Sequence, residues 1–409
     1  MSLAEAGLSQ VPTMADGSTP AAVQLHSTPS RSARDLRLDF YRGLAMFIIF
    51  VAHVPFNPWA LWIPARFGFS DATEIFVFCS GMASAFAFGR TFGARGWPVG
   101  AARTLYRAWQ IYWVHIGLFV ALAGILVLVD GGTAVADGHV AGLELQPFFA
   151  DPAAGLAGLV TLRYVPKHFD ILPMYFGILL LLPLVMALRS LGRWAPALLV
   201  GGLWFAAQFG WLDLPAEPWS DRVWFFNPFG WQLVFFTGFA FASGWIGAPP
   251  VAPRLVALAA AILLVSVPFV HFATLDASPF FAAAADRLAP LASKTELGLL
   301  RFVHFLALAY LAYVLSGPKG ENLRMSGAAG VAASAVHKVG QQALATFVMG
   351  MICARLAPVL LDMLGGGALA VAATNLAGFA VLIATAYVAG WFRAERAAPR
   401  GAERRGATI

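Results

Sequence analysis

Ten apolar segments, each close to the length of a membrane span, restrict this chain to a membrane fold. About 20 apolar residues in a helix cross the roughly 30 Å hydrocarbon core of a bilayer. Charged residues make up only 12% of the chain, whereas soluble domains carry about 25%. The segments are 38–57, 72–92, 105–129, 170–188, 195–211, 224–246, 254–272, 296–316, 338–361 and 368–391. The pattern predicts an all-α bundle of about ten transmembrane helices, with the fifth segment short and the ninth interrupted by Arg355 and Pro358.

Positive charge predicts the orientation of this bundle. Lys and Arg collect in cytoplasmic loops. If the N-terminus is cytoplasmic, inner segments and tails hold 19 of these residues and outer loops hold 6. We therefore expect both termini inside, and membrane lipids rather than nucleic acid as the partner of the +6 net charge. Residues 1–33 and 394–409 are expected to be disordered cytoplasmic tails, which leaves 34–393 as the membrane domain.

Arg42 and His53 lie eleven residues apart within the first segment. At about 100° per residue, that spacing returns both side chains to within roughly 20° of one helix face. At about 1.5 Å rise per residue, it separates them by roughly 16 Å along the helix axis. Ionisable groups at membrane depth are costly and by default mark function. With the predicted orientation, Arg42 lies near the cytoplasm and His53 in the outer half.

Four further segments place polar residues at the depth of His53. These residues are Asp71, Glu74, His168, Asp170, Tyr175, Trp224, Asn227, Trp231, Gln232, Lys294, Glu296, Arg301 and His304. A lone membrane histidine is more often a packing or hydrogen-bonding residue than a catalyst. Agreement of five helices on one depth instead favours a shared polar cavity that is open to the outside.

The residue types in this outer group suit acid–base chemistry. His53 is a candidate general base, because the unperturbed imidazole pKa lies near physiological pH. A carboxylate such as Glu74 or Asp170 is suited to fixing its tautomer. Arg301 is suited to holding a carboxylate or sugar oxygen in its planar fork, and an internal ion pair with Glu296 or Asp170 is an equal alternative.

A second polar cluster is predicted at the inner face. Arg103 and Arg107 are one helical turn apart, and Gln110 follows at the next turn. Ordinary anchoring of basic residues on the cytoplasmic side explains most such clusters. Together with Arg42, these side chains would also suit a phosphate-bearing ligand. No metal site is predicted.

Several stretches resemble the OpgC family, within the acyltransferase-3 superfamily of membrane acyltransferases. The superfamily's first-span signature is matched by Arg42 and His53 after Leu38-Asp39, and its second-span pattern by FVFCSG at 76–81. The OpgC-like stretches are RDLRLDFYRGLA (34–45), GFSDATEIFVF (68–78), RAWQIY (107–112), DILPMY (170–175), WFFNPFGWQ (224–232), KTEL (294–297), LRFVHFLA (300–307) and GQQ (340–342). Together they cover most of the chain.

The resemblance implies a multi-pass O-acyltransferase of the bacterial inner membrane. The family is associated with succinylation of osmoregulated periplasmic glucans, with succinyl-CoA as donor substrate and no tightly bound cofactor. It makes Arg42 and His53 essential residues. We expect Arg42, Arg103, Arg107 and Gln110 to hold the nucleotide of the acyl-CoA, and His53 with Glu74 to act in catalysis. The acceptor would be bound by Asp170, Tyr175, Asn227, Trp231, Gln232, Lys294, Glu296, Arg301 and His304.

Other interpretations stay open. Trp224 and Trp231 are equally suited to stacking on sugar rings and to anchoring at the membrane interface. A succinyl group needs a cation near its carboxylate, which Arg301, Lys294 or Arg355 would supply, whereas an acetyl group needs none. The main alternative function is transport or export of an anionic metabolite or glycan, and a scaffold for a glucan synthase is a third. A homo-oligomer is compatible with the sequence.

Overall fold

The structure, a computed structural model, describes residues 35–131 and 138–397. This part of the chain is built of helices, and its only strand-like pairing is an isolated bridge between Pro215 and Val223. Each predicted segment coincides with a helix, apart from shifts at the ends. These helices are α1 (Leu36–His53), α2 (Ala72–Ser84), α4 (Trp97–Val129), α8 (Ile171–Leu191), α9 (Ala195–Ala207), α10 (Pro228–Ala242), α11 (Pro253–Ser266), α14 (Leu299–Ser316), α16 (Ala343–Met363) and α17 (Gly367–Ala397).

Six helical stretches of the described chain are long and apolar enough to cross a bilayer. They are Ala72–Arg95, Trp97–Val129, Ile171–Leu191, Leu299–Ser316, Ala343–Met363 and Gly367–Glu395. Helices α9, α10 and α11 are apolar but shorter, and the eighteen residues of α1 include Arg37, Asp39 and Arg42. An all-helical fold of the described residues, with six helices that qualify as membrane spans by length and composition, is therefore confirmed, while the count of ten spans and their orientation stay predictions.

Several helix boundaries differ from the sequence prediction. Helix α1 ends at His53 because Val54 is extended, as expected of a residue that precedes a proline. The ninth segment does not break at Arg355 and Pro358, since α16 continues through both. A break occurs instead at Gln342, where the unpredicted helix α15 (Gly327–Gln341) ends. Helix α17 reaches Ala397, within the predicted C-terminal tail. Residues 1–33 and 398–409 lie outside the described residues.

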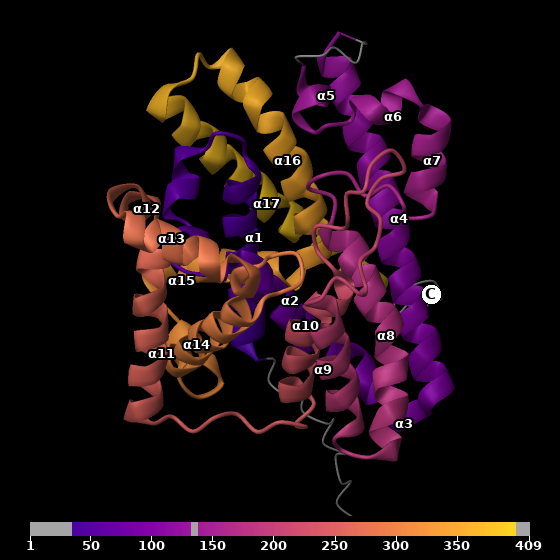
Figure 1. The fold of residues 1–409 in the computed structure, drawn as a ribbon, viewed down its shortest axis with the longest axis vertical. Coiled ribbons are helices and arrows are strands. Elements are labelled where there is room, and N and C mark those ends of the chain that lie inside the picture. Colours follow the sequence, from indigo (N-terminus) through magenta and orange to yellow (C-terminus); the bar gives the residue numbers. More distant parts are fainter. Residues whose placement is uncertain (1–34, 132–137, 398–409) are drawn as a thin grey trace, which may run out of the picture. The chain divides into compact units, whose positions relative to one another are not determined.

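Shorter helices connect the long ones. The second span bends through a π-helical turn, Ala85–Gly89, into α3 (Arg90–Arg95). The other short helices are α5 (His139–Gly142), α6 (Gln146–Ala150), α7 (Pro152–Val160), α12 (Phe272–Ala277) and α13 (Pro279–Leu288). Figure 1 shows α1 among α2, α15 and α16, and all three contact it. This central position of α1 sets the surroundings of Arg42 and His53.

Two glycines allow α1 and α15 to cross at backbone contact. A Cβ atom on Gly43 would lie 1.9 Å from the carbonyl oxygen of Val336, and one on Gly340 would lie 1.8 Å from that of Asp39. Small residues commonly permit such close approach between membrane helices. The crossing also brings the Gly340 carbonyl within 2.7 Å of the Arg42 Nε atom, so helix packing and the position of Arg42 are linked.

Replacement of Gly340 by alanine is expected to destabilise this crossing. The added methyl group has to push α1 and α15 apart, which for overpacked sites typically costs about 1–3 kcal/mol. We expect a lower thermal unfolding midpoint in detergent. Gly117→Ala on α4 is the matched control, because its Cβ would meet nothing within 4 Å. Equal midpoints for the two variants would contradict the close crossing.

Candidate functional site

His53 is the last residue of α1, and one of its two ring nitrogens already has a hydrogen-bond partner. Its Nδ1 atom lies 2.7 Å from the carbonyl oxygen of Ile49, one turn earlier in the same helix. A carbonyl oxygen only accepts, so Nδ1 carries the proton and donates it, and Nε2 is left with a lone pair. The tautomer suits a general base. The expected carboxylate partner, Glu74 or Asp170, is replaced here by a backbone carbonyl.

His168 meets His53 ring to ring and was not among the predicted site residues. The two ring centroids are 5.6 Å apart in an edge-to-face arrangement, with an interplanar angle of 70°. His168 has a backbone φ of 70°, which is uncommon outside glycine. Such backbone conformations often occur at functional sites. The depth that the sequence predicts for His168 stays a prediction, and only the tertiary structure shows that it faces His53.

Asp170 lies just before α8 and is almost fully buried, with 3% of its surface exposed. It occupies the N-cap position, but its side chain makes no capping hydrogen bond. Among the described residues, its Oδ1 atom has no hydrogen-bond partner.

The polar residues of α2 and α14 meet in a buried ion network. Arg301 donates to Glu74 Oε1 through Nε at 2.7 Å and Nη2 at 2.6 Å, and its Nη2 lies 3.4 Å from Asp71 Oδ2. Lys294 Nζ is 2.5 Å from the same Asp71 oxygen. Glu74 has no exposed surface, and it completes a capping box at the start of α2 with Asp71. The expected partners of Arg301, Glu296 or Asp170, are thus replaced by Glu74 and Asp71.

This network lies within electrostatic range of the His53 ring. The charges of Lys294 and Asp71 act electrostatically on His53, as does that of Arg355. A polar cavity shared by these helix ends around His53 stays a prediction, and the structure shows directly only the ion network between α2 and the region of α14. Their side chains largely satisfy one another, so these charges shape the field around His53 and hold the helices together.

Several residues assigned to the acceptor have structural partners instead. His304 Nδ1 lies 2.7 Å from the Ser70 hydroxyl. The Asn227 side chain caps α10 by accepting a hydrogen bond from the Phe229 amide. The Glu296 carboxylate accepts a hydrogen bond from the Ser293 hydroxyl. Gln232, without exposed surface, donates to the Val200 carbonyl. These contacts position α10 and α14, and sugar binding by these four residues stays a prediction.

The two aromatic candidates of this group are packed inside the protein. Trp231 has no exposed surface, and its indole N–H donates to the Lys294 carbonyl at 2.8 Å. Trp224 is also buried. Tyr175 is partly buried and its ring packs against Phe235 at 6.0 Å. Full burial contradicts the expectation that Trp231 stacks on a sugar ring in this conformation, since none of its surface is open.

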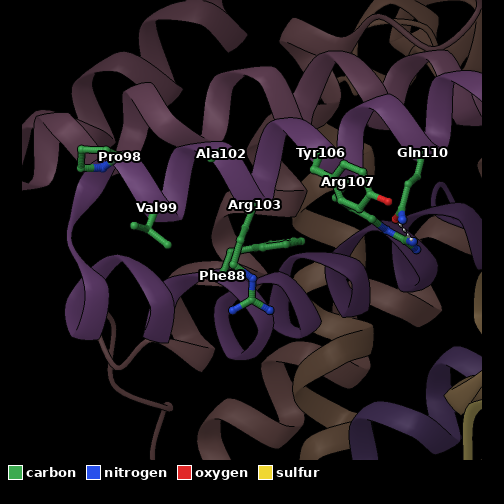
Figure 2. Close-up of a pocket in the computed structure, with 8 residues that line it drawn as sticks. All are labelled: Phe88, Pro98, Val99, Ala102, Arg103, Tyr106, Arg107 and Gln110. Carbon is green, nitrogen blue, oxygen red and sulfur yellow. Dashed lines mark hydrogen bonds between the residues drawn. The ribbon is translucent and has the colours of Figure 1, made fainter. Parts of the chain in front are cut away.

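The predicted nucleotide residues divide between two places. Arg103, Arg107 and Gln110 line a groove along α4 with a volume of about 580 Å³, together with Phe88 of the π-helical turn (Figure 2). Arg103 donates to the Thr91 hydroxyl at 2.6 Å, and Arg107 to the Gln110 amide oxygen at 3.1 Å. Neither arginine has a carboxylate partner among the described residues, so both cations remain available to an anion.

Arg42 is not part of that groove. Its Nη2 atom lies 3.0 Å from Asp39 Oδ1, one turn earlier on α1, and its Nε donates to the Gly340 carbonyl. Its side chain is buried, and its hydrogen bond to Gly340 joins α1 to α15 at their crossing. The expectation that Arg42 joins Arg103 and Arg107 around one nucleotide is not met in this structure.

The face of α1 between Arg42 and His53 is apolar and tightly packed. Met46 and Ile49 continue the face on which the two ionisable residues lie. With His53 they line a small enclosed cavity against Phe347 and Met351 of α16. These side chains close the path along the inside of the bundle, so a substrate that reaches His53 from the Arg42 end has to displace them.

Comparison with known proteins gives one result. A family model described as OpgC protein matches residues 34–394, which is nearly the whole described part of the chain. No curated protein and no solved structure matches the sequence.

Proposed function

The chain belongs to the OpgC protein family, and from this premise we propose that it is a membrane O-acyltransferase. It transfers an acyl group, succinyl or a close analogue, from cytoplasmic acyl-CoA to hydroxyl groups of periplasmic glucans. The observation that carries the proposal is the state of His53. Its Nδ1 proton is held by the Ile49 carbonyl, and Nε2 is left to accept a proton.

In this reaction His53 moves one proton. Nε2 takes the proton of a glucan hydroxyl as its oxygen forms a bond to the thioester carbonyl carbon. The tetrahedral intermediate then breaks its carbon–sulfur bond, and the imidazolium returns the proton to the departing thiolate of CoA. The Ile49 carbonyl accepts a hydrogen bond from Nδ1 throughout, which holds the ring in place and favours its protonated form.

The ion network supports this step without touching the reacting atoms. Asp71 and Glu74 carry two negative charges, and Lys294 and Arg301 carry two positive charges. Such a balanced group adds little net charge next to His53. It fixes the start of α2 against that of α14.

The groove along α4 is the proposed site for the phosphates of the donor. Arg103 and Arg107 provide two guanidinium groups, which suit phosphate geometry. The acyl end then has to reach His53 through the apolar face lined by Met46 and Ile49. Opening of this face is thus a required step, and the side chains of Met46 and Met351 are the flexible ones there.

Cells that make periplasmic glucans provide the test. Mass spectrometry of glucans from cells that contain or lack this protein identifies both the acyl group and the acceptor that carries it. The proposal requires acyl esters on the glucans only when the protein is present. Unmodified glucans in both samples, with an anionic metabolite or glycan accumulating outside the membrane, would instead support transport. If neither acyl esters nor exported substrate are found, the result would support a role as a scaffold.

A further inference from the structure

Three arginines of the described chain are buried, and one of them differs from the other two. Arg42, Arg301 and Arg355 expose 9%, 8% and 6% of their surface. Arg42 is paired with Asp39, and Arg301 with Glu74 and Asp71. Arg355 has no carboxylate within ion-pair distance among the described residues. A buried cation without an anion is costly, so it calls for an explanation.

The known contact of Arg355 accounts for only part of its charge. Its Nη2 atom donates to the carbonyl oxygen of His53, the last residue of α1, at 2.5 Å. The end of a helix carries roughly half a negative charge and favours a cation there. The Nε atom of Arg355, however, is buried with no hydrogen-bond partner among the described residues. The Nε donor is therefore left for another partner, and the helix end offsets only part of the positive charge.

Arg355 is also placed beside the proposed chemistry. It is one helical turn beyond Met351, which lines the cavity under His53. Its charge acts on His53 and on His168, the two imidazoles that meet at the end of α1. The other cation near His53, Lys294, is already neutralised by Asp71. Arg355 is therefore the group next to His53 that can take up an additional negative charge.

We infer that Arg355 determines acyl specificity by binding the terminal carboxylate of a dicarboxylic acyl group. The thioester carbonyl then lies at His53 Nε2, and the far end of the short acyl chain lies at the guanidinium. The planar fork of arginine, through Nε and a terminal nitrogen, matches a carboxylate. This inference rests on the proposed acyltransferase function and adds to it the residue that recognises the carboxylate of the acyl group.

Two donors and two substitutions test the inference. Transfer to glucan is measured with succinyl-CoA and with acetyl-CoA, which lacks the second carboxylate. For Arg355→Gln we expect the ratio of kcat/KM for succinyl-CoA to that for acetyl-CoA to fall about ten- to hundredfold, because the charge-assisted bonds are lost. Arg355→Lys is expected to recover part of the ratio, since it keeps the charge without the fork.

Arg103→Gln is the matched control. It removes a guanidinium from the proposed phosphate groove, which serves both donors alike. We expect it to lower kcat/KM for both and to leave their ratio unchanged. Equal losses for both donors in Arg355→Gln would overturn the inference, because Arg355 would then act on the reacting oxyanion or on the fold. An unchanged ratio with normal activity would overturn it too.

A binding measurement separates this inference from the acyltransferase proposal. In the wild-type protein, we expect succinyl-CoA to raise the thermal unfolding midpoint more than acetyl-CoA does, and Arg355→Gln to abolish that difference. If the wild type transfers nothing yet shows this difference, the acyltransferase proposal fails while the carboxylate site stands. If transfer occurs and both donors stabilise wild type and variant equally, the carboxylate site fails alone.

The stability of the ligand-free variant gives an independent readout. Glutamine at 355 keeps a polar side chain with a hydrogen-bond donor but carries no charge. Because Arg355 lacks a carboxylate partner, we expect its neutral replacement to leave the unfolding midpoint unchanged or higher. A purely structural cap of α1 would instead lose stability, and a large drop would overturn the inference.

Discussion

His53→Gln is expected to lower the rate of acyl transfer by about 10²–10⁴-fold, the usual contribution of a general base. The glutamine amide does not take up a proton at neutral pH. The change therefore removes the basic Nε2 atom, while the side chain stays polar and of similar length. The measurement is CoA thiol release by purified protein with acyl-CoA and glucan, at matched protein amounts.

A second histidine controls for nonspecific effects of the same substitution. His271 stacks on Phe272 outside the His53 site, and His271→Gln is expected to keep near wild-type activity. Unfolding midpoints of both variants show whether each is folded. Retained activity in a folded His53→Gln protein would refute the role of His53 as base.

Arg301→Met is expected to have the largest effect on folding. It leaves Glu74, which has no exposed surface, without its guanidinium partner. Removal of one member of a buried ion pair typically costs about 3–5 kcal/mol, because the remaining charge is buried and unpaired. We expect a much lower unfolding midpoint and loss of folded protein during purification.

The double variant Glu74→Gln, Arg301→Met identifies the cause of that loss. Glutamine retains an oxygen that can accept from the Asp71 amide, as Glu74 does at 2.8 Å, and no unpaired charge remains at either position. Most of the lost stability should therefore return. Lys167→Ala, which breaks the exposed pair with Glu144, should cost at most about 1 kcal/mol. A double variant no more stable than Arg301→Met would show that the charge pair is not the reason.

The sequence predicted the helices well because hydrophobic length and periodicity are local properties. Each of the ten segments coincides with a helix, and Arg42 and His53 lie on one face of α1 because their spacing fixes it. Helix α15 was missed in most of its length, since its glycine- and alanine-rich sequence lacks the continuous apolar run of a span. The end of α1 was placed too late, although Pro55 gave a signal for it.

The partners within the site could not be predicted in the same way. Arg301 and Glu74 are 227 residues apart in the chain, and no local pattern determines which carboxylate an arginine meets. The same holds for the contact of His168 with His53 and for the Ile49 carbonyl that replaces the expected carboxylate. The sequence contains the residue types, whereas the three-dimensional packing determines which of these side chains have partners and which do not.

The isolation of Arg355 is the clearest result of that kind. From sequence, Arg301, Lys294 and Arg355 were equal candidates for binding an acyl carboxylate. Two of them prove to be neutralised by Asp71 and Glu74. Only the absence of a carboxylate partner among the described residues distinguishes Arg355, and this depends on contacts between helices that are far apart in sequence.

The most direct test of the central claim is transfer of a labelled acyl group by the purified protein. The protein is incubated with glucan and succinyl-CoA that carries isotope in the succinyl carbons, and both products are analysed by mass spectrometry. The account predicts label on glucan hydroxyl groups, with one CoA thiol released per ester formed, for the wild type and not for His53→Gln. Unlabelled glucan beside intact succinyl-CoA, or equal labelling by both proteins, would contradict it.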